Sequence, residues 1–248
     1  MSDLFIVATP IGNLGDITFR AVETFKNVDV IAAEDTRHTL QLLNALEAKG
    51  YATHDELHKT LVSCRSQNEV DGAKKIISFL DEGKSVAFAS DAGTPAVSDP
   101  GAVLVDLVRQ AGHNVVPIPG VSAFSTLVSV AGTGGKTVIF EGFLSPKSGR
   151  RKSRVQELMQ TGDAFVLYES PFRIVKLLGD IADTDSERRV VVGREMTKLY
   201  EEIKSGSAKE LFEDFASRQK ILGEFAVFVS GTKEKNKKNI QDNSTFLD

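Results

Sequence analysis

A loop that contains carboxylates but no basic residue stands where nucleotide-binding proteins often carry a phosphate loop. Residues 90–101, SDAGTPAVSDPG, follow an apolar run and precede the helical pattern AVLVDLVRQAG. Two further loops follow apolar runs, at residues 8–16 (ATPIGNLGD) and 34–37 (EDTR), and the first lacks the G-x-G-x-x-G glycines. Backbone amides, carbonyls and carboxylates suit a neutral or cationic ligand better than a phosphate. We therefore predict that these loops bind neither NAD nor ATP, although each loop alone is also consistent with ordinary turn chemistry.

Alternating strand and helix patterns are needed to bring such loops together, and the chain has them. Short β-branched runs predict strands at residues 4–8, 28–33, 61–64, 85–90 and 114–119, and i, i+3, i+4 spacing predicts helices between them. This α/β order favours a largely parallel sheet, which collects ligands at the carboxyl ends of its strands. Pro117 and Pro119-Gly120 then interrupt the pattern, and a second series of strands and helices follows. We predict two α/β domains, residues 1–118 and 119–232, and a polar, disordered tail at 233–248.

Composition places few limits on function. The 248 residues are 41% hydrophobic, which is enough for one large core or two smaller ones. A net charge of −4 gives no overall attraction to nucleic acid, so a polyanionic partner needs a local basic patch. The single cysteine, Cys64, has no partner for an internal disulfide, and the N-terminal segment lacks a basic region and a long apolar run. We expect a cytoplasmic protein that does not enter a membrane.

A basic run at residues 145–154, SPKSGRRKSR, contrasts with the rest of the chain. Its cations are Lys147, Arg150, Arg151, Lys152 and Arg154, and no acidic residue lies among them. Cations at the start of a helix oppose its dipole, which argues against a merely solvated helix start, although that reading stays open. We predict that this run contacts RNA phosphates.

Two other patterns resemble known motifs without meeting their requirements. His54 and His58 are spaced like the histidines of a zinc-protease helix, but Asp55 replaces the glutamate base and no third ligand is evident. Residues 132–137, GTGGKT, are not a phosphate loop because Val130 stands where the first glycine is required. We predict no metal site and no nucleoside triphosphatase activity.

Several long motifs together resemble one family. They are residues 5–18 (FIVATPIGNLGDIT), 34–37 (EDTR), 90–95 (SDAGTP), 98–101 (SDPG), 117–120 (PIPG), 140–144 (FEGFL), 168–171 (YESP) and 194–202 (REMTKLYEE). In this order they closely resemble the tetrapyrrole methylase-like class (class III) of S-adenosylmethionine-dependent methyltransferases, and within it the bacterial enzymes that modify small-subunit ribosomal RNA. The resemblance runs from residue 4 to residue 231.

The resemblance implies two α/β domains with S-adenosylmethionine bound in the cleft between them, and a homodimer. It also implies methyl transfer to the ribose 2′-hydroxyl of a cytidine in the decoding region of 16S rRNA in the small ribosomal subunit. Matching motif positions one by one implies cofactor contacts at Ile11, Ala92, Gly93, Thr94, Val97, Ser122, Ala123, Glu169 and Met196. We add Asp91 as an acceptor for hydroxyl or amine donors, with a helix-capping role as the alternative.

Methyl transfer itself needs little beyond positioning, but a ribose hydroxyl must lose its proton during attack. Glu34, Asp35 and Lys198 are candidate bases or charge stabilisers, and Arg37 is available to orient a carboxylate or to bind phosphate. An N-cap with a surface ion pair is the alternative at residues 34–37. Phe172 replaces a family histidine, and residues 64–69 (CRSQNE) also lack one, so we expect no histidine base at either place. Residues 48–58 are longer than the family pattern and have no assigned role.

Three functions remain open from the sequence: ribose 2′-O-methylation of ribosomal RNA, methylation of a tetrapyrrole on the same scaffold, and RNA binding without catalysis. The basic run and the full-length motif match favour the first. Occupation of the cofactor site distinguishes the third from the other two.

Overall fold

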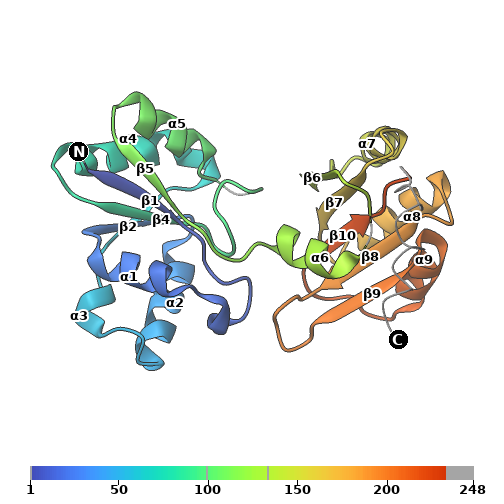
Figure 1. The fold of residues 1–248 in the computed structure, drawn as a ribbon, viewed down its shortest axis with the longest axis horizontal. Coiled ribbons are helices and arrows are strands. Elements are labelled where there is room, and N and C mark those ends of the chain that lie inside the picture. Colours follow the sequence, from blue (N-terminus) through green and yellow to red (C-terminus); the bar gives the residue numbers. More distant parts are fainter. Residues whose placement is uncertain (1, 99, 133, 233–248) are drawn as a thin grey trace, which may run out of the picture. The chain divides into compact units, whose positions relative to one another are not determined.

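The computed structural model describes residues 2–98, 100–132 and 134–232 of the chain. It divides into two compact units, which we call unit 1 (Met1–Ala123) and unit 2 (Phe124–Asp248), shown in Figure 1. The domain boundary predicted from the sequence, after residue 118, lies a few residues before this division. The predicted disordered tail, residues 233–248, lies outside the described residues.

Unit 1 is built on a parallel sheet with the strand order β3-β2-β4-β1-β5. Its strands are β1 (Asp3–Val7), β2 (Val30–Ala33), β3 (Thr60–Ser63), β4 (Val86–Ala89) and β5 (Asn114–Ile118). Its helices are α1 (Phe19–Asn27), α2 (Thr36–Ala48), α3 (His54–Leu57), α4 (Glu69–Asp81) and α5 (Ala102–Gln110), with 3-10 turns η1 (Leu14–Asp16) and η2 (Ser66–Asn68). The prediction of a parallel sheet is therefore confirmed for this unit.

Helices cover both faces of the unit 1 sheet, because successive strand residues point to opposite sides (Figure 1). On one face, α1, α2 and α3 pack buried residues such as Phe25 and Leu46 against Ile31 of β2. On the other face, α4 and α5 pack residues such as Ile76 against Phe88 of β4. The sheet is thus fixed from both sides, and the loops at its carboxyl edge have a rigid base.

Unit 2 is built on a mixed sheet with the order β6-β7-β10-β8-β9, in which only β6 and β7 pair in parallel among the described residues. Its strands are β6 (Val138–Phe143), β7 (Ala164–Glu169), β8 (Arg189–Arg194), β9 (Glu202–Ser207) and β10 (Phe225–Val229). Its helices are α6 (Ala123–Ala131), α7 (Ser148–Gln160), α8 (Ile174–Thr184) and α9 (Ala208–Ser217). Strand β9, EIKSGS, is absent from the sequence prediction because it has almost no apolar residues.

The main core of unit 2 lies between its sheet and helices α7, α8 and α9. Leu158, Leu177 and Phe215 from these helices pack against strand residues such as Phe165 and Val227. Every helix in the described part of the chain is too short or too polar to cross a lipid bilayer.

Candidate functional site

Neighbouring strands of unit 1 bring the loops that the sequence singled out to one edge of the sheet. Strands β2, β4, β1 and β5 are consecutive in the sheet and run parallel. Their carboxyl ends therefore share an edge, and the loops after them, at residues 34–37, 90–101, 8–16 and 119–122, emerge next to one another.

Hydrogen bonds tie three of these loops together. Thr9 after β1 and Gly93 after β4 exchange backbone hydrogen bonds, with N–O distances of 2.8 and 3.0 Å. The Thr94 hydroxyl donates to the carbonyl of Val121 after β5, at 3.2 Å. Because backbone groups make most of these bonds, the arrangement depends little on side-chain charge.

Gly93 is the point of closest approach between these loops. Its φ of +78° lies in the left-handed region, and a Cβ atom placed there would lie 3.3 Å from Cγ2 of Ile11 and 3.8 Å from the Val121 carbonyl oxygen. A larger side chain would have to displace Ile11 and the β5 loop as well as strain the backbone. Ile11, Gly93 and Thr94, all expected to contact the cofactor, are therefore brought together.

The rest of the loop after β4 is held in an unusual backbone conformation. Ala96 and Ser98 have φ values of +65° and +68°, which non-glycine residues rarely adopt. Such conformations persist where the surrounding structure holds them, and they concentrate at functional sites. Val97 between them is half-buried, Ala92 is exposed, and Ser122 and Ala123 are half-buried after β5.

Glu34 after β2 lies next to two other carboxyl groups, those of Asp35 and Asp91. It is half-buried, and its Oε2 accepts a hydrogen bond from the Asp91 backbone N–H at 3.4 Å. Burial raises the pKa of Glu34, and the nearby Asp91 and Asp35 carboxylates raise it further, although the Asp91 N–H partly opposes this shift. A carboxyl group with a raised pKa is a stronger proton acceptor once it is ionised.

Asp35 has a structural role that disfavours it as a base. It caps α2, accepting from the Arg37 backbone N–H at 2.9 Å and from Arg37 Nε at 3.0 Å. Hydrogen bonds from the Arg37 side chain and, to a smaller extent, from the Arg37 backbone N–H hold the pKa of Asp35 well below its usual range. The helix cap and surface ion pair that the sequence left open are thus both present, and Arg37 is engaged with Asp35 while staying largely exposed.

Asp91 is also occupied by neighbours in unit 1. Its Oδ1 accepts the backbone N–H of Asp35 at 3.0 Å, and its Oδ2 lies 3.0 Å from Nδ1 of His38. A carboxylate can accept several hydrogen bonds, so these contacts orient Asp91 and leave it able to accept further hydrogen bonds.

Arg65 joins this group, and the sequence analysis did not identify it. It follows β3, its Nε donates to the Glu34 carbonyl at 3.2 Å, and its Nη2 lies 3.9 Å from Asp35 Oδ2. The sequence did contain a signal for Arg65, because it stands directly after a predicted strand. Nearby Glu69 accepts from the backbone N–H of Gly101 at 2.8 Å and helps to hold the start of α5.

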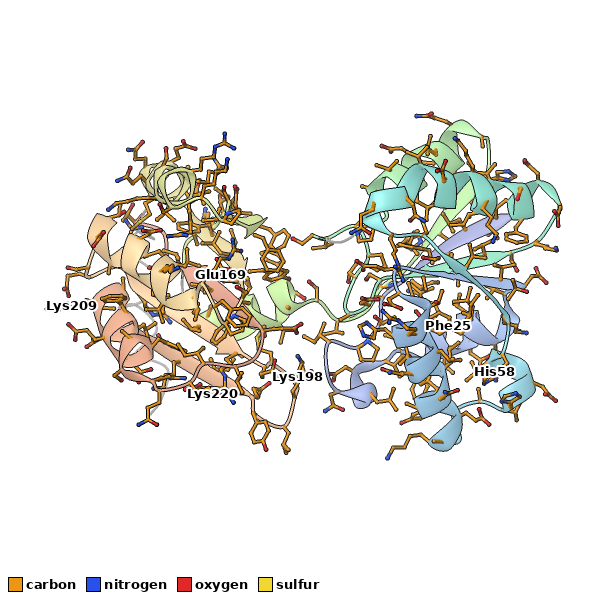
Figure 2. All side chains as sticks on the ribbon, turned by 180° about the vertical axis from the view of Figure 1, so that it is seen from behind. Phe25, His58, Glu169, Lys198, Lys209 and Lys220 are labelled. Atoms are coloured by element: carbon orange, nitrogen blue, oxygen red, sulfur yellow. The ribbon has the colours of Figure 1, made fainter. Side chains whose placement is uncertain are left out.

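Glu169 in unit 2 is a buried carboxylate that uses only one of its two oxygens in hydrogen bonds to other described residues. It is 2% exposed, and its Oε1 accepts from the Ser170 backbone N–H and from Arg173 Nε, both at 2.7 Å. Its Oε2 is buried and has no hydrogen-bond partner among the described residues. Buried polar atoms are usually paired, so this oxygen is suited to a donor from a ligand. Figure 2 labels Glu169 and shows it within unit 2.

Met196 lies in a second strained loop, directly after β8. It is 6% exposed, and a Cβ atom on Gly193 would lie 2.7 Å from its sulfur, so the pair requires glycine there. Glu195 and Thr197 on either side have φ values of +49° and +67°, and the Thr197 hydroxyl is buried without a partner among the described residues. Like the loop after β4, this loop therefore contains two non-glycine residues with left-handed backbone.

Lys198 is held as a cation by two glutamates. Its Nζ lies 2.9 Å from carboxylate oxygens of both Glu195 and Glu224. Burial lowers the pKa of Lys198, but the hydrogen bonds to Glu224 and Glu195 outweigh burial and raise it. A lysine held protonated in this way is better suited to stabilise a negative charge than to act as a base, and its catalytic role stays a prediction.

Arg151 in the basic run is buried rather than available to a polyanion. It is 3% exposed on the inner side of α7, and its Nε lies 2.6 Å from Asp180 of α8. The prediction that Arg151 contacts RNA phosphate is therefore wrong, because the side chain joins two helices within unit 2.

The other cations of α7 are partly neutralised by acids that lie far away in sequence. Lys152 pairs with Asp183 at 2.8 Å, and Arg154 pairs with Glu141 at 2.7 Å. These two cations therefore carry less net charge toward a polyanion than the sequence alone indicates, and their contact with RNA phosphate stays a prediction. Lys147 and Arg150 are exposed, and no ion pair joins either of them to another described residue.

Comparisons with known sequences identify relatives of this chain. Residues 3–211 match the family Tetrapyrrole (Corrin/Porphyrin) Methylases. A Borrelia garinii protein named ribosomal RNA small subunit methyltransferase I is 46% identical over 228 residues, which cover 92% of this chain and 98% of that protein. A Thermotoga maritima protein of the same name is 42% identical over 231 residues, covering 93% of this chain and 99% of that protein.

Solved structures share the fold at low sequence identity. A cobalt precorrin-4 methyltransferase of cobalamin biosynthesis superposes with a TM-score of 0.63 and 16% identity, covering 92% of this chain and 94% of that one. A uroporphyrin-III C-methyltransferase from Thermus thermophilus superposes with a TM-score of 0.60 and 14% identity, covering 93% and 94%. At this level of identity the likeness extends to the fold alone.

Proposed function

The chain belongs to the tetrapyrrole methylase family and is a methyltransferase, and we propose that it methylates the ribose 2′-hydroxyl of a cytidine in 16S rRNA with S-adenosylmethionine as methyl donor. The observation that carries this proposal is the set of interlocked loops after β1, β4 and β5, which offers backbone groups and a glycine-sized space but no basic side chain within residues 90–101. The relatives named as small-subunit rRNA methyltransferases, aligned over nearly the whole chain, support RNA as the substrate.

The residues of unit 1 fit S-adenosylmethionine better than a phosphate-bearing cofactor. When bound, this molecule supplies an electrophilic methyl group on a sulfonium, and it offers hydroxyl and amine donors rather than phosphates. The loop carbonyls and Asp91 can accept those donors, while Gly93 leaves room beside Ile11. We propose that Ala92, Thr94, Val97, Ser122 and Ala123 complete this part of the site, and that Glu169 and Met196 are further cofactor contacts, as the family resemblance implies.

Glu34 is our proposed base. Its partial burial beside Asp91 raises its pKa, and neutralisation by an arginine, as at Asp35, does not occur at its carboxylate among the described contacts. The carboxylate would accept the proton of the ribose hydroxyl as its oxygen takes the methyl group, whose bond to the sulfonium sulfur breaks and leaves the neutral thioether. Most of the remaining rate acceleration would come from alignment and exclusion of water.

Fewer cations of the basic run are assigned to the RNA substrate than the sequence suggested. We propose that Lys147 and Arg150 on α7 contact RNA phosphates, with Arg37 and Arg65 beside the loop after β2 as further positive groups. We also propose that the substrate is the cytidine presented in the small subunit, that the chain acts as a homodimer, and that it works in the cytoplasm where subunits assemble.

Labelled methyl transfer tests the proposal. Small subunits from cells that lack this gene, incubated with the protein and S-adenosylmethionine carrying a labelled methyl group, should acquire label in an alkali-resistant dinucleotide, because a 2′-O-methyl group blocks hydrolysis of the following phosphodiester. Deproteinised 16S rRNA in a parallel reaction shows whether the assembled subunit is required. Transfer to uroporphyrinogen III instead of RNA would support the tetrapyrrole alternative.

A further inference from the structure

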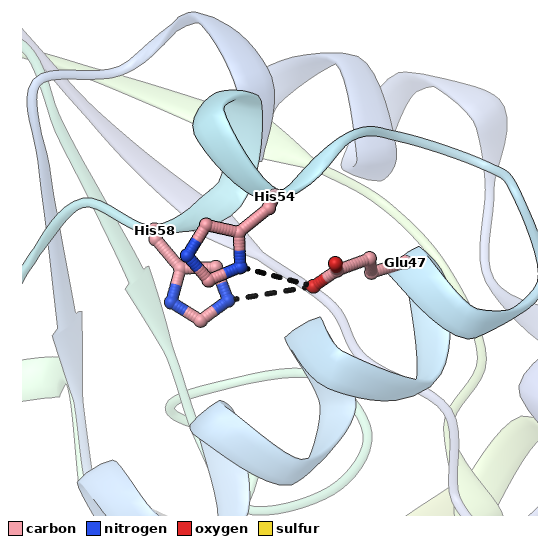
Figure 3. A group of neighbouring side chains, drawn as sticks. All are labelled: Glu47, His54 and His58. Atoms are coloured by element: carbon pink, nitrogen blue, oxygen red, sulfur yellow. Dashed lines mark hydrogen bonds and ion pairs between the residues drawn. The ribbon is translucent and has the colours of Figure 1, made fainter.

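Two histidines and a glutamate converge on the outer side of unit 1, in the segment to which the sequence assigned no role. Glu47 lies near the end of α2, His54 begins α3 and His58 follows it. Figure 3 shows both imidazole rings directed at the same carboxylate oxygen. Glu47 Oε2 lies 3.3 Å from Nδ1 of His54 and 3.5 Å from Nε2 of His58.

These separations match those between ligands of a tetrahedral metal ion. Zinc binds imidazole nitrogen and carboxylate oxygen at about 2.0–2.2 Å, so two ligands at the tetrahedral angle are about 3.4 Å apart. The ligand atoms of all three residues lie within 4.8 Å of one another. The three atoms therefore lie close enough together to be ligands of one ion.

A simple ion pair is a less complete explanation of the arrangement. The His54 and His58 rings are stacked with their centroids 3.5 Å apart and an interplanar angle of 25°. Both rings direct a nitrogen at the same Glu47 oxygen, and a single ion pair accounts for only one of these two contacts. An ion that accepts lone pairs from both neutral rings and from the carboxylate satisfies all three groups together.

We propose that Glu47, His54 and His58 bind one divalent transition-metal ion of the zinc class, with water in the remaining position. Two imidazole nitrogens and one carboxylate suit zinc and its neighbours, whereas magnesium and calcium prefer oxygen ligands. The sequence prediction of no metal rested on a missing third ligand. Glu47 supplies that ligand from the preceding helix.

The role of the ion is to join α2 to α3. Helix α3 has only four residues, a length that is unstable in isolation, and it is anchored by Leu57 in the core and by the Thr53–Glu56 capping box. A metal bridge between Glu47 and the two histidines would fix the intervening loop. Glu47 lies about 16 Å along α2 from Thr36 at 1.5 Å per residue, so the ion would be structural and remote from the loop after β2.

Zinc titration of the metal-free protein by calorimetry tests the site. The chain has four histidines, and His113, which is half-buried and pairs with Asp81 at 2.9 Å, offers a control histidine in the same unit. We expect wild type and H113A to bind zinc with one-to-one stoichiometry and micromolar or tighter affinity. Affinity should fall by about a hundredfold in H54A/H58A, as loss of groups in a metal site generally costs at least tenfold to a hundredfold. E47Q should also weaken binding.

Thermal unfolding gives an independent readout. Zinc should raise the melting temperature of wild type and H113A but leave H54A/H58A unchanged, because an ion that binds only the folded state stabilises it. Zinc binding by H54A/H58A equal to that of wild type, or no saturable binding by wild type at micromolar zinc, would overturn the proposal. Competition by millimolar magnesium at the same residues would contradict the assigned class of ion.

Discussion

The loop after β4 and the first turns of α7 differ in what holds their polar groups. Residues 90–98 are held by backbone hydrogen bonds to a neighbouring loop, and Gly93, Ala96 and Ser98 among them have left-handed backbone. The cations of α7 are held by carboxylates from other elements, such as Asp180 and Asp183. The hydrogen-bonding groups of a site built from backbone can therefore be predicted from local sequence. The net charge of a basic run cannot, because acids that are distant in sequence pack against it and neutralise part of it.

The largest effect should follow a change at Gly93. G93L places a side chain against Ile11 and the Val121 carbonyl, and we expect S-adenosylmethionine affinity to fall by at least about a hundredfold, or about 2.7 kcal/mol. G83L is the matched control, because Gly83 has a similar φ of +83° but open space around its Cβ position. Calorimetry on both folded variants measures the difference, and an affinity of G93L equal to that of G83L would remove Gly93 from the cofactor site.

Removal of the proposed base should have the next largest effect. E34Q should lower kcat by about 100- to 1,000-fold, within the usual range for general-base catalysis, while cofactor affinity changes little. In wild type, kcat/KM should fall as pH decreases and Glu34 gains a proton, and the raised pKa of Glu34 places this limb above that of an ordinary glutamate. D35N keeps an N-cap residue and should retain the limb. A pH profile of E34Q identical to wild type would exclude Glu34 as the base.

Arg151 should matter for stability rather than for RNA. R151A leaves Asp180 without its partner beneath α7, and we expect the free energy of unfolding to fall by about 3 kcal/mol, as for other buried ion pairs. K152A breaks an exposed pair with Asp183, and because solvent screens such a pair we expect a much smaller fall in the free energy of unfolding. Urea denaturation of the two variants makes the comparison, and similar losses would show that burial of Arg151 has no energetic consequence.

A smaller effect is expected at the two α7 cations that make no ion pair with another described residue. K147A/R150A should leave cofactor affinity unchanged but reduce the slope of log RNA affinity against log salt by about 1.4–1.8, at 0.7–0.9 per phosphate contact. K152A/R154A, whose parent side chains are paired with acids, should reduce it less. A slope in K147A/R150A equal to that of wild type would remove α7 from the RNA interface.

The features that the sequence predicted depend on local residue patterns. The loop after β4 was identified because glycine, proline and aspartate specify backbone conformation within a few residues. Strand β9 was missed because its residues, EIKSGS, carry no apolar alternation, and its pairing with β8 decides its structure. The partners of Arg151 and of His54 were missed because Asp180 and Glu47 reach them only through packing of separate helices.

Mapping of 2′-O-methylation in 16S rRNA from cells with and without this gene tests the central claim most directly. We predict that one cytidine in the decoding region loses its 2′-O-methyl group when the gene is removed. Complementation with wild type or the G83L variant should restore it, and complementation with G93L or E34Q should not. An unchanged methylation map in the deletion strain would contradict the proposed function.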